Sequence, residues 1–91
     1  MSNQLSVIIP VLNEKNNILP LTKKIKKNLK RFKFEIIFVD DSSTDGSIKL
    51  LIKLKKKFNF FRPILRKKKK DLSQSCFDGI NKSKFENILI M

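Results

Sequence analysis

Three carboxylates and four hydroxyl groups fall within eight consecutive residues, Asp40-Asp41-Ser42-Ser43-Thr44-Asp45-Gly46-Ser47. They follow the apolar run 36–39, which the pattern predicts to be a strand buried on both faces. A carboxylate at the end of such a strand is costly unless it has a partner. Because ligands of open α/β sheets bind beyond the carboxyl ends of the strands, the adjacent pair indicates acceptors for a nucleotide base or ribose. Asp40 is expected to be the inward, structural member and Asp41 the ligand-facing one. The alternative is a helix cap that pairs with a lysine.

A second loop of the same kind follows the apolar run 5–11, which ends in Leu12-Asn13-Glu14. Glu14 could reach a ribose or a base edge, and Asn13 could hold the loop. A plain helix cap explains the same two residues equally well. Pro10 lies near the end of the run, where it can close a strand without interrupting a central ladder.

A third candidate is the cationic cluster 66–70, which closes the expected third strand. Arg66 is its most specific member, since it points to the same sheet edge as the aspartates and could pair with a diphosphate. A solvated basic loop is the competing interpretation. The chain has only two glycines, Gly46 and Gly79, so it lacks a glycine-rich phosphate cradle. That absence argues against a dinucleotide-binding Rossmann enzyme and against a P-loop NTPase.

Apolar periodicity predicts four strands and three helices in the order β-α-β-α-β-α-β, an α/β fold with an open, mostly parallel sheet and flanking helices. The expected strands cover residues 5–11, 34–39, 59–66 and 86–91, and Pro63 makes the third an edge strand. The first helix carries an apolar stripe through Phe32, a cap at Asn16 or Asn17, and Pro20 in its first turn. The second covers 47–57 and could be capped by Thr44, Asp45 or Ser47. The third is capped by Asp71 or Ser73 and has the inward stripe Leu72, Cys76, Phe77 and Ile80.

The length and the net charge of the chain limit the functions that it could have. Ninety-one residues form one small domain at most, and the net charge is +13. Eighteen of the 21 cations are lysine, whereas nucleic-acid readers favour arginine, so a solvated lysine surface is preferred and no nucleic acid is expected as a partner. The chain has no histidine, and its single cysteine permits no internal disulfide. No signal peptide or long apolar run is visible, which predicts a cytoplasmic polypeptide.

Four segments, LSVIIPVLNE, FEIIFVDDSSTDGS, RKKKKDLSQSCFDGI and FENILIM, together resemble the N-terminal part of a family-2 inverting glycosyltransferase with the GT-A fold. Within that family the chain is most similar to the polyprenyl-phosphate (dolichyl-phosphate) mannose synthases. The resemblance implies a Rossmann-like nucleotide-binding half. It also implies transfer of a sugar, mannose from GDP-mannose, to a polyprenyl phosphate. Leu12 stands where the family often has Tyr, and Asp71 and Ser73 stand where many members have Gly.

The resemblance also implies roles for individual positions. It assigns contacts to the nucleotide after the first strand, to base and ribose after the second, and to the diphosphate and lipid phosphate after the third. These positions are Pro10, Leu12 and Glu14, then Val39 and Asp41, then Arg66 and Lys69.

In this family a motif that binds Mg²⁺ or Mn²⁺ directly follows the strand matching 86–91. The resemblance makes Met91 the residue before that motif, and the strand is expected to be buried up to Met91. No catalytic residue and no metal ligand is therefore assigned within the chain, because the expected metal motif lies beyond Met91.

Residues 1–91 are accordingly expected to be a single, truncated nucleotide-sugar-binding half that is inactive alone. The expected location is the cytoplasm or the cytoplasmic face of a membrane, reached through the acceptor or a C-terminal part. A second hypothesis, from another class, is a small basic non-catalytic module that binds nucleic acid or an anionic membrane surface through its lysines.

Overall fold

The computed structural model describes residues 3–41, 43–66 and 72–91, with the backbone alone for 72 and 73. These residues form a four-stranded sheet with the order β3-β2-β1-β4, and every neighbouring pair of strands is parallel. The predicted α/β class and element order are confirmed. In chain order the elements are β1 (Gln4–Val11), α1 (Lys15–Asn28), β2 (Lys33–Asp41), α2 (Ser47–Lys57), β3 (Phe61–Arg66), α3 (Leu72–Lys82) and β4 (Ile88–Ile90).

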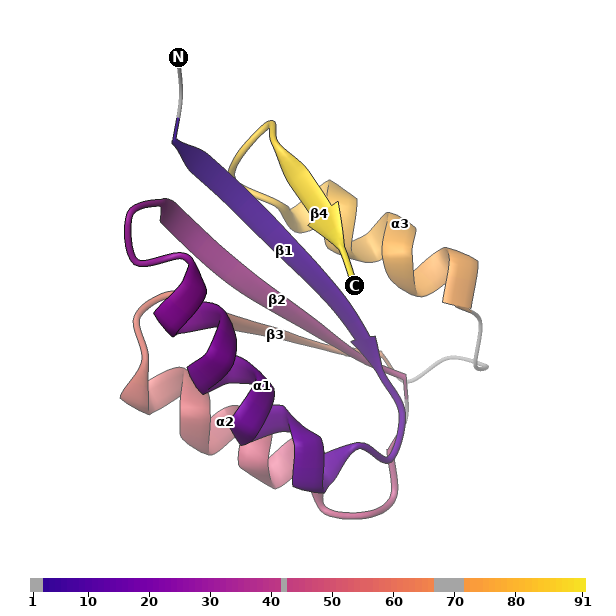
Figure 1. Cartoon of the computed structure of the whole chain (residues 1–91). Coiled ribbons are helices and arrows are strands. Elements are labelled where there is room, and N and C mark those ends of the chain that lie inside the picture. The colour runs from indigo at the N-terminus through magenta and orange to yellow at the C-terminus, as the bar shows by residue number, and fades with distance from the viewer. Residues whose placement is uncertain (1–2, 42, 67–71) are drawn as a thin grey trace.

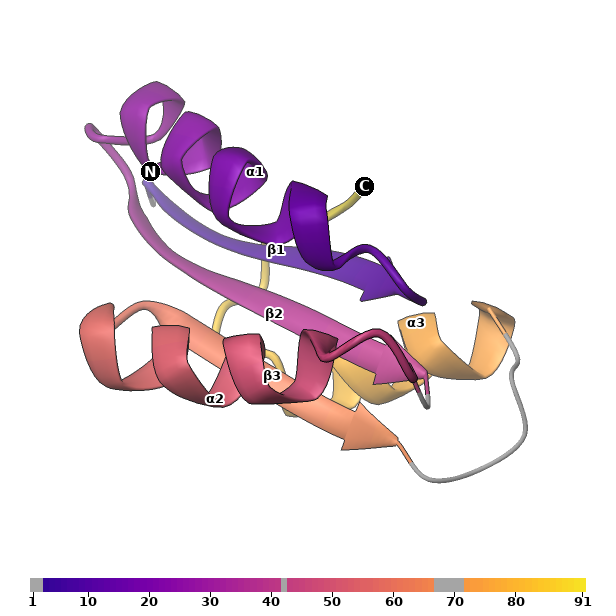
Figure 2. The same cartoon turned by 90° about the horizontal axis from the view of Figure 1, so that it is seen from below.

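Helices cover both faces of the sheet, α1 and α2 on one side and α3 on the other (Figures 1 and 2). The strands supply both cores because successive side chains alternate between the faces. Ile36 and Phe38 join the larger cluster beneath α1 and α2, whereas Ile37 and Val39 lie in the smaller one on the α3 side. The continuous apolar run of β2 is thus explained by burial on both faces.

The third helix packs through small residues, which corrects the predicted apolar stripe. Phe77 is 59% exposed and Cys76 is only partly buried, while Ser75 and Gly79 are buried against the sheet. A Cβ placed on Gly79 would lie 2.5 Å from Ile8 Cγ2. The helix backbone therefore approaches β1 and β2 more closely than a row of large apolar side chains would allow.

Element boundaries differ from the sequence prediction at several points. The second strand runs through Asp41, so the two aspartates belong to the strand rather than to the loop that follows. The first helix ends at Asn28, which leaves Phe32 beyond it and 43% exposed. Glu14, not Asn16 or Asn17, occupies its N-cap position, and Pro20 lies inside the helix rather than in its first turn.

The two edge strands are shorter than predicted. The third strand begins at Phe61 and has only β2 as a neighbour among the strands that the structure describes, so the expected edge position of Pro63 is confirmed. The fourth strand is limited to Ile88–Ile90 and pairs with β1. No helix among the described residues is long and apolar enough to cross a membrane.

The expectation of a buried strand that extends through Met91 was wrong. The last residue pair between β1 and β4 joins Ile8 to Ile90, so Met91 lies just beyond the strand, although its backbone N–H still donates to Ile8 O at 3.0 Å. The side chain of Met91 is 54% exposed, and those of Leu89 and Ile90 are nearly half exposed. The physical reason is the edge position of β4, which has only β1 as a neighbour among the described strands.

Candidate functional site

The carboxyl ends of β1, β2 and β3 lie side by side at one edge of the sheet, as the parallel pairing requires (Figure 1). The register places Val11 beside Asp40 and Asp41 beside Arg66. Three segments that are far apart in sequence therefore meet there: the loop 12–14, the loop 43–46 and the end of β3. This is the edge at which open α/β sheets bind their ligands.

Asp41 forms a buried ion pair with Arg66 on the α3 side of that edge. Arg66 Nη1 lies 3.1 Å from Asp41 Oδ1 and donates to Ser75 Oγ at 2.7 Å. The Ser75 hydroxyl in turn donates to Asp41 Oδ2 at 3.3 Å, and Arg66 Nε lies 2.9 Å from Asp78 Oδ2. Arg66 lies at the same sheet edge as the aspartates, as expected, and its pairing with Asp41 was not predicted. The same contacts hold Asp41 in a fixed orientation, since two elements besides its own strand supply its partners.

Asp40 is fully buried on the opposite face, as expected for the inward member of the pair. Its Oδ2 accepts the backbone N–H of Ser43 at 3.0 Å, which turns the chain out of β2. Its Oδ1 has no hydrogen-bond partner among the described residues.

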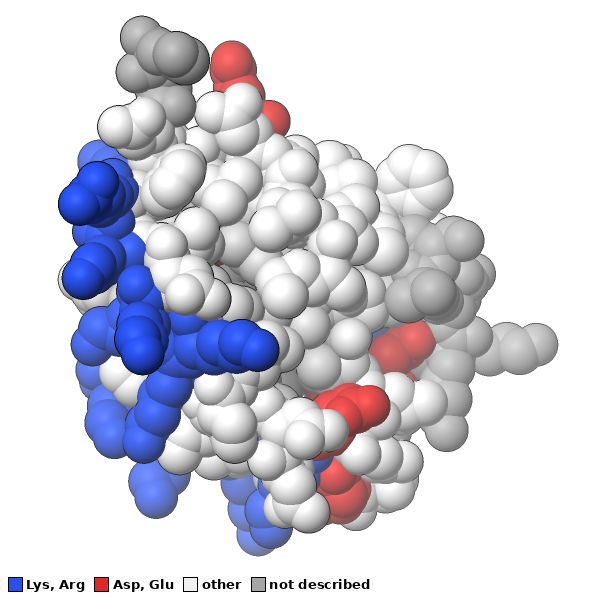
Figure 3. Space-filling model, viewed as in Figure 1, with Lys and Arg blue, Asp and Glu red and all other residues white. Residues whose placement is uncertain are grey.

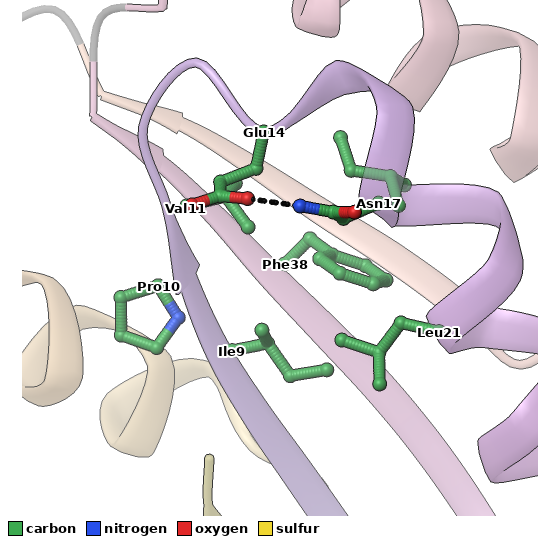
Figure 4. A pocket seen from close by; sticks show the side chains of 8 residues that line it. Ile9, Pro10, Val11, Glu14, Asn17, Leu21 and Phe38 are labelled. Carbon is green, nitrogen blue, oxygen red and sulfur yellow. Dashed lines mark hydrogen bonds between the residues drawn. The ribbon is translucent and has the colours of Figure 1, made fainter.

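A cavity of about 200 Å³ lies between the end of β1 and the start of α1 (Figure 4). Apolar side chains from β1, β2 and α1 form most of its wall, and Glu14 and Asn17 are its polar members. The Asn17 amide donates to Glu14 Oε2 at 2.6 Å. Ligand pockets usually measure about 300–1,000 Å³, so this cavity fits one part of a ligand and leaves the remainder outside. Its lining residues are Ile9, Pro10, Val11, Glu14, Asn17, Ile18, Leu21 and Phe38.

Asp45 links the two loops and was expected only as a helix cap. Its Oδ2 accepts the backbone N–H of Lys15 at 3.0 Å, and its Oδ1 accepts the Ser47 backbone N–H at 3.0 Å and the Ser47 hydroxyl. The Ser47 hydroxyl and then these backbone donors hold the pKa of the exposed Asp45 carboxyl below its usual value. The bond to Lys15 spans thirty residues, so no local pattern could reveal it.

The predicted ligand positions are distributed unequally. Pro10 and Glu14 line the cavity. Leu12 is not among its lining residues and is 37% exposed. Val39 is fully buried on the α3 side, so it offers no exposed surface to a ligand in this structure. Lys69 lies outside the described residues, together with the rest of the basic loop 67–70.

No metal site is visible in the described part of the chain, where no three His, Cys, Asp or Glu side chains come together as possible ligands. The metal motif was expected beyond Met91, which is the last residue of the sequence. That motif stays a prediction.

Most of the described basic residues belong to the segment that spans α1, β2 and α2. The segment 15–57 contains thirteen lysines and arginines, and its stretches 15–34 and 46–57 contain no carboxylate. Figure 3 shows these cations over one side of the molecule. None of them forms an ion pair with a described carboxylate. Five of these lysines and Phe58 border a groove of about 470 Å³ between α1 and α2. Its lining residues are Lys23, Lys26, Lys27, Lys30, Lys57 and Phe58.

Comparison with known proteins identifies the family. The model of glycosyl transferase family 2 matches residues 6–91. Dolichol-phosphate mannosyltransferase of Saccharomyces cerevisiae is 35% identical over 94 residues, which cover 100% of this chain and 35% of the yeast protein. Dolichol-phosphate mannosyltransferase of Pyrococcus furiosus is 32% identical over 88 residues, covering 97% of this chain and 25% of that protein. The chain thus spans about a third or less of these relatives.

A solved structure shares the fold. The mannosyltransferase of Pyrobaculum calidifontis, in complex with GDP-Man and Mn²⁺, superposes with a TM-score of 0.76 at 21% identity. The match covers 92% of this chain and 25% of that one. The sequence resemblance and the parallel sheet therefore agree with an independent structure. Since the family model spans nearly the whole sequence, the chain belongs to glycosyl transferase family 2.

Proposed function

We propose that this chain is the nucleotide-sugar-binding part of a glycosyltransferase that transfers mannose from GDP-mannose to a polyprenyl phosphate. The observation that carries the proposal is that Glu14, beside an apolar cavity, and Asp41 both lie at the carboxyl edge of a parallel sheet, the cavity on the α1 side and Asp41 on the α3 side. The relatives support it, because they include dolichol-phosphate mannosyltransferases and an undecaprenyl-phosphate 4-deoxy-4-formamido-L-arabinose transferase of Proteus mirabilis, 41% identical over 51 residues. That last match covers 54% of this chain and 16% of the other protein.

In the proposed site Glu14 and Asp41 accept hydrogen bonds from the nucleoside. For Asp41 the partner is proposed to be a base or ribose group, bound beside the contacts of this carboxylate with Arg66 and Ser75. The ion pair with Arg66 fixes the direction of the Asp41 carboxylate. Arg66 is buried and contacts Asp41, Ser75 and Asp78, and its contact with a diphosphate stays a proposal. Lys69 stays a proposed phosphate ligand, outside the described residues.

A divalent cation, Mg²⁺ or Mn²⁺, is proposed for the full-length enzyme, in keeping with the Mn²⁺ of the structural relative. Such a cation would offset the charge of the departing diphosphate. The described residues do not bring together three side chains that could bind this cation, so no residue of this chain is proposed as a metal ligand. Residues 1–91 alone are proposed to be inactive, and a site of action at the cytoplasmic face of a membrane stays a prediction. The hypothesis of a non-catalytic basic module is not favoured, since the family model covers residues 6–91.

The proposal is tested by titrating GDP and GDP-mannose into the isotope-labelled chain and following backbone amide shifts. We expect saturable shifts at residues 12–14 and 43–46 that Asp41→Asn weakens by at least tenfold, since a hydrogen bond to a charged group contributes about 1.5–3 kcal/mol. Asp78→Asn is the matched control, because it also removes a carboxylate beside Arg66 but belongs to α3 and not to the end of β2. Shifts confined to the lysine groove, or equal affinity in the Asp41 and Asp78 variants, would contradict the proposed site.

A further inference from the structure

We infer that Asn13 is a positioning residue that fixes the loop carrying Glu14 against the loop that follows Asp41. The inference rests on the proposed nucleotide site and deepens it, because it names what sets the spacing between the two acceptors. Glu14 follows β1 and Asp41 ends β2. The separation of the two carboxylates therefore depends on the bonds that join these loops.

Asn13 makes that junction with both its backbone and its side chain. Its backbone N–H donates to Ser43 Oγ at 2.9 Å. Its side-chain Oδ1 accepts the backbone N–H of Thr44 at 2.8 Å and faces the Thr44 hydroxyl at 3.4 Å. Two successive residues of the second loop are thus bound by a single residue of the first, about thirty positions earlier in the chain.

The backbone conformation explains why an asparagine stands at this position. Asn13 has φ +53° and is the one non-glycine residue with positive φ in the described part of the chain. Asparagine is among the side chains that enter the left-handed region most readily. A glycine would adopt this φ equally well but would lose the Oδ1 acceptor, and an alanine would lose the acceptor and also be strained.

The bonds continue from Asn13 to both proposed ligand acceptors. Ser43, which accepts from Asn13, donates its own N–H to Asp40, the residue before Asp41. Glu14 is the residue after Asn13 and lines the cavity. A continuous path of covalent and hydrogen bonds therefore links Glu14 to Asp41, and Asn13 forms the step between the loops. The hydrogen bond from the Lys15 N–H to Asp45 joins the same two loops.

A ligand that contacts both loops benefits from loops already held at the right distance, because binding then need not order them. Loss of the Asn13 amide should lower affinity more than stability alone would explain. Replacement by aspartate keeps an oxygen acceptor for Thr44 N–H and tolerates positive φ, so it should restore binding. This pattern separates a positioning role from a merely structural one.

The experiment compares GDP binding by the wild-type chain and by Asn13→Gly, Asn13→Asp and Ile25→Val, with thermal melts of each. Ile25→Val is the control for stability, because Ile25 is buried in α1 away from the edge. We expect Asn13→Gly to weaken GDP binding about tenfold, Asn13→Asp to stay within about threefold of wild type, and Ile25→Val to bind normally despite a lower melting temperature. Wild-type affinity in Asn13→Gly would overturn the inference.

A failure of the proposed function is distinguished by hydrogen exchange in the absence of nucleotide. If the wild-type chain does not bind GDP, the proposed site fails, yet the junction is still judged from the amides of Thr44 and Lys15. Faster exchange at both in Asn13→Gly, with unchanged exchange at Leu54 in α2, supports the coupling of the loops. Unchanged exchange at Lys15 would overturn it, since Lys15 is bound to Asp45 and not to Asn13.

Discussion

Ser6 of β1 donates its hydroxyl hydrogen to Glu35 of β2 at 2.6 Å, beneath the segment that joins α3 to β4. The two residues are direct neighbours in the strand register and both are buried. Glu35 also accepts from the backbone N–H of Lys84 and from Arg62 Nη1, at 2.6 Å for the latter. The Ser6 oxygen accepts the backbone N–H of Phe85 at 3.1 Å. This network lies at the end of the sheet opposite the candidate site and fixes the segment 84–85, which leads into β4.

The first prediction is that Glu35 makes stability depend on acid pH. Burial alone would raise the pKa of Glu35, but the hydrogen bonds from Ser6, Lys84 and Arg62 outweigh it and lower that pKa below the ordinary value of 4.5. A carboxyl with a depressed folded pKa contributes stability that is fully present above its unfolded pKa and is lost as pH falls through its folded pKa. Urea melts between pH 3 and 7 should show this loss in the wild type. Glu35→Gln should cost about 1–3 kcal/mol at neutral pH and flatten the acid limb. An acid limb of unchanged steepness in Glu35→Gln would contradict the assignment.

The alternation of side chains is the part of the fold that the sequence determines most directly. The run 36–39 and its neighbour 5–11 predict a doubly covered parallel sheet because apolar residues occupy both faces. The alternation also places Asp40 and Asp41 on opposite sides, which the structure confirms. The tight packing of α3 through Ser75 and Gly79 could not be predicted in this way, since a small residue gives no apolar signal in the sequence.

Contacts between loops could not be predicted from the sequence either. Asn13 was a candidate for holding its own loop, but its partners, Ser43 and Thr44, become neighbours only once β1 and β2 pair. Asp45 was one of three expected caps of α2. Gly46 holds the N-cap position instead, although Asp45 accepts the Ser47 N–H, and the bond of Asp45 to Lys15 depends on the same pairing. The sequence pattern can indicate the contacts that such a residue makes within its own loop, but not its contacts with a distant loop.

The second prediction concerns the buried ion pair of Asp41 and Arg66. Removal of one partner leaves an uncompensated buried charge, which costs about 3–5 kcal/mol. Arg66→Met should therefore destabilise the chain strongly, and the double variant Arg66→Met with Asp41→Asn should lose less than the sum of the single changes. Denaturant unfolding of the four proteins measures this. Arg62→Met is the control, because the Arg62 side chain is 43% exposed and should matter less. Strict additivity of the two single changes would show that the pair is not coupled.

The third prediction tests the close approach of α3. Gly79→Ala places a Cβ against Ile8, and overpacking of this kind typically costs about 1–3 kcal/mol. Ile8→Ala removes the clashing methyl group, so the double variant should be less destabilised than the two single losses predict. Gly46→Ala is a useful contrast, since its cost arises from a φ of +90° and should not be relieved by any change at Ile8. Thermal melts of these variants are sufficient. A Gly79→Ala protein as stable as wild type would mean that α3 lies farther from the sheet.

The last prediction concerns the lysines over α1 and α2. Thirteen cations in residues 15–57, none paired with a described carboxylate, should repel one another in the folded state. Salt screens such repulsion over about 10 Å at 0.1 M, so the melting temperature should rise between low salt and about 0.3 M NaCl. Lys23→Glu, in the middle of α1 and one turn before Lys27, should stabilise the chain at low salt by a few tenths of a kcal/mol, as expected for one exposed charge pair. Lys82→Glu is the matched control on α3, where it lies one turn after Asp78 and should destabilise. Equal effects of the two reversals, or a melting temperature that falls with salt, would show that these cations are too well hydrated to interact.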